Sequence, residues 1–283
     1  MFMYLGCGMS ARTPNVPSMT RLSYDDYLRH LGSDSARLRE VLAGCDPEAR
    51  VPGCPEWTAT DLLGHHGGVL QFWADIVEQR PAGPGDDWTE PEKPTAYDDL
   101  LAYHEEQEAR LLAALAAADP SETAWTWSTE QTVGFTFRRQ AHEALIHRLD
   151  AEQTAGTPSP LDAALATDGV EESLAVMFGG GPTWGTFTGD GRHVRVDVAD
   201  TGASIWVELG RFTGTDPDSG KDYDEDDIAA VADPGREADA VLVGPAADLD
   251  AWLWRRGGDD ALRVSGDPAT YDAFRLVVDQ AID

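Results

Sequence analysis

Cysteine and long apolar runs are both scarce in this sequence of 283 residues. The cysteines are Cys7, Cys45 and Cys54, an odd number without a C-x-x-C pair, which argues against a disulfide framework and a zinc ribbon. We therefore expect a reducing, cytoplasmic location. No apolar run approaches the ~20 residues that a membrane span needs. The opening residues lack the basic segment of a signal peptide, and a start at Met19 would leave residues 1–18 outside the natural protein.

Positive charge is also scarce. The chain has 51 acidic and 21 basic residues, a net charge of −30, and Lys93 and Lys221 are its only lysines. Such a surface repels phosphate backbones and anionic headgroups, which argues against nucleic acid or a membrane surface as a partner. A halophilic protein has this composition, and a high-GC genome is the alternative explanation. Because salt of about 1 M shortens the Debye length to roughly 3 Å, we expect stability to rise with salt.

Amphipathic periodicity predicts four long helices in the first half of the chain. Ser23 is placed to cap the first helix, and Thr58 with Asp61 forms a capping box for the second. Four such helices indicate a bundle. The predicted helices span about 23–44, 58–80, 95–119 and 135–155.

The second half has a different character. Val194, Val196 and Val198 alternate with polar residues, as in an antiparallel strand, whereas the acidic run 214–227 is interpreted as a solvated loop. The predicted fold class is α+β with two domains, a four-helix bundle over 19–156 and a smaller α+β domain with an antiparallel sheet over 157–283. Further strands are predicted at 193–212, 239–244 and 261–266, and further helices at 161–178, at 245–258 and from Asp267-Pro268 onward.

The fourth predicted helix carries an E-x-x-x-H pattern. Glu143, His147 and Asp150 fall within about 60° of one another on a helix, while His142 points elsewhere. A carboxylate and an imidazole four residues apart can bend toward one cation. A solvated Glu–His pair explains the same pattern, so the spacing alone does not establish a metal site.

The second predicted helix carries adjacent histidines, His65 and His66, on the two flanks of its apolar stripe. Periodicity does not choose between them. If one joins Glu143 and His147, the set is that of catalytic zinc with a vacant fourth position. The alternative is an ordinary buried histidine with satisfied hydrogen bonds.

Two segments, "VPGCPEWTATDLLGHHGG" and "AHEALIHRLDAE", resemble the mycothiol-dependent maleylpyruvate isomerase family, a branch of the DinB-like four-helix metalloproteins. A later segment, "ADAVLVGPAADLDAWLWRRGGDDALRVSGD", is similar to the C-terminal domain of that family, which is related to sterol-carrier-like folds. The resemblance implies that His65, Glu143 and His147 bind a divalent metal, zinc by expectation. His66 departs from the family pattern and either replaces or supports His65.

The family chemistry implies an isomerase or S-transferase in which a low-molecular-weight thiol, mycothiol or an equivalent, adds to an electrophilic small molecule. A metal-bound thiol loses its proton and becomes the nucleophile. Asp150 and Arg148 are candidates to orient the ligands. Cys54 is assigned a structural role, because the reaction needs no protein cysteine.

A dicarboxylate substrate would need cationic partners, for which the guanidinium group is well suited. Arg255 and Arg256 are the candidates, with Arg138 and Arg139 as alternatives, and the cleft between the domains is the expected pocket. Two other functions stay open. A metal-dependent hydrolase would not need added thiol, and a non-catalytic binding module would not need the metal.

Overall fold

The computed structural model describes residues 20–85 and 88–280, and within them the chain forms two compact units. One unit comprises Leu22–Thr126 and Glu130–Leu161, and the other comprises 162–280 with two short segments, 20–21 and 127–129. The proposed start at Met19 and the residue Cys7 lie outside the described residues. The domain boundary predicted after residue 156 falls in the connection between the helices that end at Thr154 and begin at Ala163.

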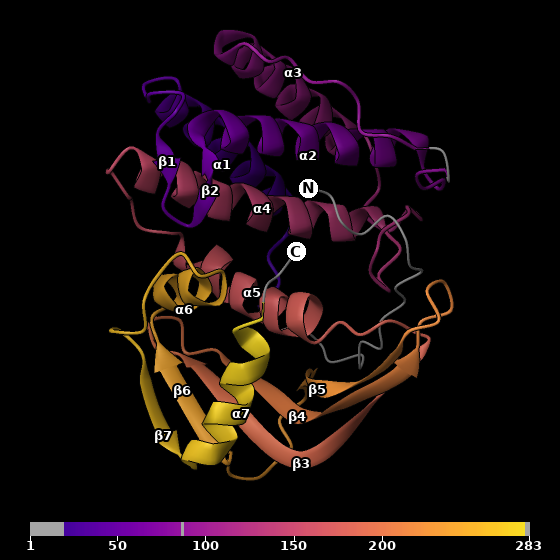
Figure 1. The fold of residues 1–283 in the computed structure, drawn as a ribbon, viewed down its shortest axis with the longest axis vertical. Coiled ribbons are helices and arrows are strands. Elements are labelled where there is room, and N and C mark those ends of the chain that lie inside the picture. The colour runs from indigo at the N-terminus through magenta and orange to yellow at the C-terminus, as the bar shows by residue number, and fades with distance from the viewer. Residues whose placement is uncertain (1–19, 86–87, 281–283) are drawn as a thin grey trace. The chain divides into compact units, whose positions relative to one another are not determined.

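The first unit is a four-helix bundle, which confirms the predicted architecture (Figure 1). Helix α1 packs mainly against α4, and α2 packs mainly against α3. Leucine side chains from α1 and α2, among them Leu38 and Leu62, are fully buried between the helices. The bundle helices are α1 (Tyr24–Leu42), α2 (Ala59–Gln79), α3 (Tyr97–Ala116) and α4 (Val133–Thr154).

Side-chain caps set where the first two helices begin, as the sequence predicts. The Ser23 hydroxyl accepts a hydrogen bond from the Asp26 amide, and Thr58 and Asp61 form a reciprocal capping box. The Thr58 amide donates to Asp61 Oδ2 at 2.8 Å. Caps of this kind stabilise a helix by about 1 kcal/mol. The capping box also places His65 in the second turn of α2.

A short hairpin that the sequence analysis did not predict precedes α2. Its strands, β1 (Arg50–Val51) and β2 (Cys54–Thr58), pair antiparallel. Only Val51 is buried among these residues, so no alternating apolar pattern marks the strands. The hairpin ends directly at the Thr58 cap and so places Trp57 beside the start of α2.

The second unit is an α+β fold built on a five-stranded sheet. The strand order is β5-β4-β3-β6-β7, with β3 and β6 parallel and the other neighbours antiparallel. Val194, Val196 and Val198 all face the core, as predicted. The strands are β3 (Gly185–Val198), β4 (Ser204–Thr215), β5 (Asp222–Val231), β6 (Ala240–Gly244) and β7 (Arg263–Gly266). The helices are α5 (Ala163–Glu172), which continues as a π-helical segment η1 (Ser173–Phe178), α6 (Ala246–Leu253) and α7 (Pro268–Val278).

The interpretation of the acidic run 214–227 as a loop is wrong at both ends, because residues 214 and 215 belong to β4 and residues from Asp222 onward to β5. Residues from Asp222 onward form β5, the edge strand that pairs with β4. Arg211 on β4 donates to Asp224 and Asp226 at 2.8 and 2.7 Å, which neutralises part of the acidic charge. Backbone pairing and cross-strand arginine contacts therefore stabilise a strand whose composition alone indicates a loop.

In the part of the chain that the structure describes, no helix is both long enough and apolar enough to cross a bilayer.

Candidate metal centre

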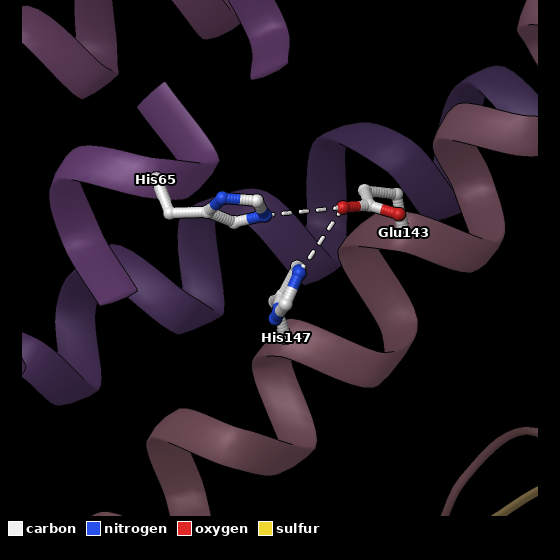
Figure 2. Close-up of side chains that lie close together, drawn as sticks. All are labelled: His65, Glu143 and His147. Atoms are coloured by element: carbon white, nitrogen blue, oxygen red, sulfur yellow. Dashed lines mark hydrogen bonds and ion pairs between the residues drawn. The ribbon is translucent and has the colours of Figure 1, made fainter. Parts of the chain in front are cut away.

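Three side chains from two bundle helices converge on one point, and we call them the Glu143 cluster: His65 from α2, and Glu143 and His147 from α4 (Figure 2). The Nε2 atom of His147 lies 3.1 Å from Glu143 Oε1, and the Nε2 atom of His65 lies 3.5 Å from the same oxygen. One potential ligand atom from each residue lies within 4.8 Å of the others. The structure thus brings together all three residues predicted as metal ligands.

The helical geometry explains the convergence. Glu143 and His147 are four residues apart on α4, so their side chains lie on one face one turn apart. The side chains of His65, Glu143 and His147 are 22%, 19% and 8% exposed, so the cluster is largely buried and its first two members keep some contact with solvent. Two imidazoles with one carboxylate are the donor set of catalytic zinc sites that keep a position open.

Asp150 orients His147 in the way the sequence predicts. Its Oδ2 lies 3.0 Å from Nδ1 of His147, and its side chain is fully buried. Because a carboxylate at Nδ1 favours the proton there, Nε2 keeps its lone pair for the cluster when the ring is neutral. Arg148 lies outside this arrangement, because its guanidinium contacts Asp34 and Glu152.

The second oxygen of Glu143 has its own partner. Arg139 is one turn earlier on α4, and its Nη2 donates to Glu143 Oε2 at 3.3 Å. The sequence predicts Arg139 only as an alternative partner for a substrate carboxylate. Its position at i, i+4 before Glu143 is the sequence signal for this contact.

The charges of the Glu143 cluster shift the pKa values of its members. Burial alone would lower the pKa of His147, but the Glu143 carboxylate and the Asp150 hydrogen bond raise it to about 9. Burial alone would raise the pKa of Glu143, but the His147 charge and the two histidine hydrogen bonds hold it well below its usual value. For His65, burial lowers the pKa despite the nearby carboxylate. With these pKa shifts, the metal-free cluster favours a His147 imidazolium between the carboxylates of Glu143 and Asp150 and a neutral His65.

His66, the neighbour of His65, belongs to a different network, which we call the His104 relay: Glu108, Arg39, His104 and His66. His66 is fully buried, and its Nδ1 lies 2.8 Å from Nε2 of His104 on α3. Nη1 of Arg39 lies 3.4 Å from His104 Nδ1 and also donates to Glu108. Burial, with the Arg39 charge, lowers the pKa of His104 to about 3. The structure thus separates the two histidines that periodicity leaves equivalent.

Trp57, at the end of the hairpin, packs against the Glu143 cluster. Its ring centroid lies 4.6 Å from that of His65 and 6.2 Å from that of His147. The half-buried indole restricts both imidazoles on one side. In the sequence, Trp57 belongs to the segment that resembles the family, and its position directly before the Thr58 cap is the signal that indicates a place beside the start of α2.

The residues predicted to bind a substrate carboxylate are placed as follows. Helix α6 ends at Leu253, so Arg255 and Arg256 follow the helix instead of ending it as predicted. Arg255 has a φ of 59°, and Nη1 of Arg256 donates to the Trp254 carbonyl at 2.6 Å. Arg138 is buried on α4.

Two other residues discussed above, His142 and Cys54, contact neighbouring side chains of the bundle. His142 is buried on α4, and its ring contacts the ring of Tyr27 at a centroid distance of 6.2 Å. Cys54 is half-buried in β2 and packs against the apolar core between α1 and α2.

Both units of the chain resemble domains of known proteins. Residues 28–152 match the model of the mycothiol maleylpyruvate isomerase N-terminal domain, and residues 164–273 match that of the corresponding C-terminal domain. Two crystal structures of the mycothiol-dependent maleylpyruvate isomerase, one of them a histidine-to-alanine mutant, have a similar fold. Each aligns with a TM-score of 0.53 and 14% identity, over 86% of this chain and 93% of the other.

The remaining comparisons give one weak structural match and no curated match. A ubiquinone synthesis protein described as UbiJ-SCP2 aligns with a TM-score of only 0.21 over 42% of this chain, so the relation to sterol-carrier folds stays a prediction. No match was found among curated proteins. Because the two domain models together span both units of the structure, the chain belongs to the mycothiol maleylpyruvate isomerase family.

Proposed function

We propose that this protein is a metal-dependent isomerase that uses a low-molecular-weight thiol, mycothiol or an equivalent, as its nucleophile. The observation that carries the proposal is the convergence of His65, Glu143 and His147 within 4.8 Å in a bundle of this family. These residues would hold a divalent cation, zinc by expectation. When bound, the cation would supply a Lewis acid that lowers the pKa of a coordinated thiol.

The residues around the cluster prepare it for such a cation. Asp150 accepts the Nδ1 proton of His147 and so directs Nε2 toward the cluster. Arg139 binds the outer oxygen of Glu143, which leaves Oε1 directed at both imidazoles. Trp57 covers one side of the rings and limits the access of water.

The proposed reaction is a cis–trans isomerisation of a small dicarboxylate such as maleylpyruvate. The thiolate sulfur forms a bond to one carbon of the cis double bond, the π-electron pair moves onto the conjugated carbonyl as an enolate, and the former double bond then rotates as a single bond. Collapse of the enolate re-forms the double bond in the trans geometry, breaks the carbon–sulfur bond and expels the same thiolate. No atom is gained or lost overall, so the thiol acts as a true cofactor.

Binding of the substrate carboxylates is assigned to arginine. Arg255 and Arg256 are proposed as the partners because the guanidinium fork matches a carboxylate. Arg139 is a poorer candidate, because it already binds Glu143. A substrate without one carboxylate should therefore show a raised KM, and Arg256→Ala should reduce that difference.

The test uses purified full-length protein. We expect bound metal near one equivalent, and isomerisation of maleylpyruvate that requires both metal and added thiol. Glu143→Gln, which preserves shape but removes the charged ligand, should lose both the metal and the activity. Glu78→Gln, at an exposed ion pair on α2, is the matched control and should keep both.

Three outcomes would contradict the proposal. Activity that is indifferent to thiol would favour a hydrolase on the same bundle. Metal binding without turnover of any tested electrophile would contradict the enzymatic role. A protein that retains no metal would favour a non-catalytic binding module.

A further inference from the structure

His66 lies beside the Glu143 cluster, although it does not belong to the group whose ligand atoms lie within 4.8 Å of one another. Its ring centroid is 5.8 Å from that of His147, compared with 4.9 Å for His65. With metal–nitrogen bonds of about 2.0–2.1 Å, two imidazoles on one tetrahedral ion have centroids ~5 Å apart. A small movement would therefore make His66 a third imidazole ligand. Such a ligand would fill the position that a thiol needs.

Arg39 determines which atoms donate and which accept in the hydrogen bonds of the His104 relay. A guanidinium group can only donate, so the His104 Nδ1 atom, 3.4 Å from Arg39 Nη1, must be the acceptor. Glu108 Oε2 lies 4.0 Å from the same nitrogen, beyond hydrogen-bond distance, and is bonded to Arg39 instead. A neutral His104 therefore carries its proton on Nε2.

The second step fixes the tautomer of His66. The Nε2–H of His104 donates to Nδ1 of His66 across 2.8 Å, so Nδ1 is an acceptor and the proton of His66 is on Nε2. Both rings are fully buried, and the guanidinium charge beside His104 opposes a second positive charge there. The relay thus sets the tautomers of two neutral imidazoles in series.

We propose that the His104 relay keeps His66 from binding the metal by holding a proton on its Nε2 atom. A protonated imidazole nitrogen has no lone pair to offer a cation. The relay would leave His65, Glu143 and His147 as the protein ligands and preserve an open position for thiol. His66 Nε2 has no hydrogen-bond partner among the described residues, which accords with a proton held there by the relay and not by a local acceptor. This inference rests on the proposed function, because it concerns the ion proposed there.

Two substitutions of His104 separate the hydrogen-bond role from simple packing. In His104→Gln, the amide oxygen can accept from Arg39 and the amide nitrogen can donate to His66, so the direction is preserved. In His104→Met, the side chain fills similar space but donates nothing. Cobalt(II) is the probe, because its absorption spectrum reports ligand type and number, and X-ray absorption counts the imidazoles.

We expect two imidazoles in the wild type and in His104→Gln, and three in His104→Met. Addition of a simple thiol should give a sulfur-to-cobalt charge-transfer band in the first two proteins. The thiol affinity of His104→Met should fall at least about tenfold, because the open position is filled. Adding His66→Phe to His104→Met should restore two imidazoles and thiol binding.

The tautomers can be measured without metal. Long-range ¹H–¹⁵N spectra of the metal-free wild type and of His104→Gln should show the His66 proton on Nε2. A proton on Nδ1, or three imidazoles in the wild type, would overturn the inference. Two imidazoles in a folded His104→Met would also overturn it while leaving the proposed function intact. Absence of any cobalt binding by the wild type would refute the metal of the proposed function and this inference together.

Discussion

The Glu143 cluster and the His104 relay place adjacent histidines in opposite environments. His65 faces a carboxylate that two imidazoles share, whereas His66 faces another imidazole that an arginine keeps neutral. The Glu143 cluster offers a carboxylate and imidazole lone pairs to a cation. In the His104 relay, the imidazole lone pairs accept hydrogen bonds, which disfavours cation binding. The partner across the helix interface, and not the position along the helix, therefore determines what each histidine can bind.

The same contrast appears in the helices that supply the partners. Helix α4 presents Glu143, His147 and Asp150 on one face, so every donor has an acceptor one turn away. Helix α3 presents His104 and Glu108, with Arg39 from α1 between them. An arginine inserted beside an imidazole makes that site unfavourable for a second cation.

The largest predicted effect is the difference in zinc affinity between a substitution of His65 and a substitution of its neighbour His66. His65→Ala should weaken zinc affinity by at least about a hundredfold, because even the loss of an outer partner of a ligand costs 10–100-fold. His66→Phe should leave zinc affinity nearly unchanged. Its cost should be about 1–3 kcal/mol of unfolding free energy, because the buried His104 Nε2–H loses its acceptor. Competition with a zinc chelator and urea unfolding measure the two quantities. Equal losses of affinity in both variants would contradict the comparison.

A smaller effect is expected at the group that orients His147. Asp150→Asn should lower zinc affinity by about 10–100-fold, because the amide no longer stabilises the Nδ1 proton by charge. Glu78→Gln is the matched control, since it neutralises a carboxylate of an exposed ion pair on α2, and it should leave zinc affinity unchanged. An equal affinity loss in the control would contradict a specific role of Asp150.

The pH dependence of the metal-free protein should distinguish His147 from His104 in sign. The pKa of His147 rises from 6.5 to about 9 on folding, so its stabilising contribution is complete below 6.5 and is lost as pH rises through 9. The pKa of His104 falls from 6.5 to about 3, so the unfolded state takes up the proton first and stability is lost as pH falls from 6.5 toward 3. Ring ¹⁵N shifts measure both titrations directly. Titration of both rings near 6.5 would be the contrary result.

The smallest effect per charged group is expected at the surface, where water and salt screen the charges. With a net charge of −30, the melting temperature should rise between dilute and molar KCl, because salt shortens the range of repulsion. Zinc affinity at the partly buried Glu143 cluster should change less. A melting temperature that is flat or falls with KCl would contradict the expectation of salt adaptation.

The bundle helices and half of the candidate site could be predicted from sequence for physical reasons. The caps at Ser23 and Thr58 act within three residues, and the Glu143–His147 spacing acts within one helical turn. Such local rules are visible in a single sequence. Of the two candidates for orienting the ligands, Asp150 contacts His147 and Arg148 does not.

The remaining features depend on contacts between distant segments. His65 and His66 flank the apolar stripe of α2 almost equally, so periodicity does not choose between them. The family resemblance favours His65, and the packing of α3 and α4 places the two side chains in different networks. No local signal connects His104 with a residue 38 positions earlier. The strand beginning at Asp222 is likewise stabilised by its neighbour β4, so its own composition predicts a loop.

Because Trp57 contacts the two imidazoles, its intrinsic fluorescence should report metal binding. Indole emission responds to charge and to metal-bound groups nearby, and this ring lies 4.6 Å from His65. The chain has nine tryptophans, so the difference between wild type and Trp57→Phe would isolate the signal of this one. Loading and release of the ion could then be followed in real time without a label.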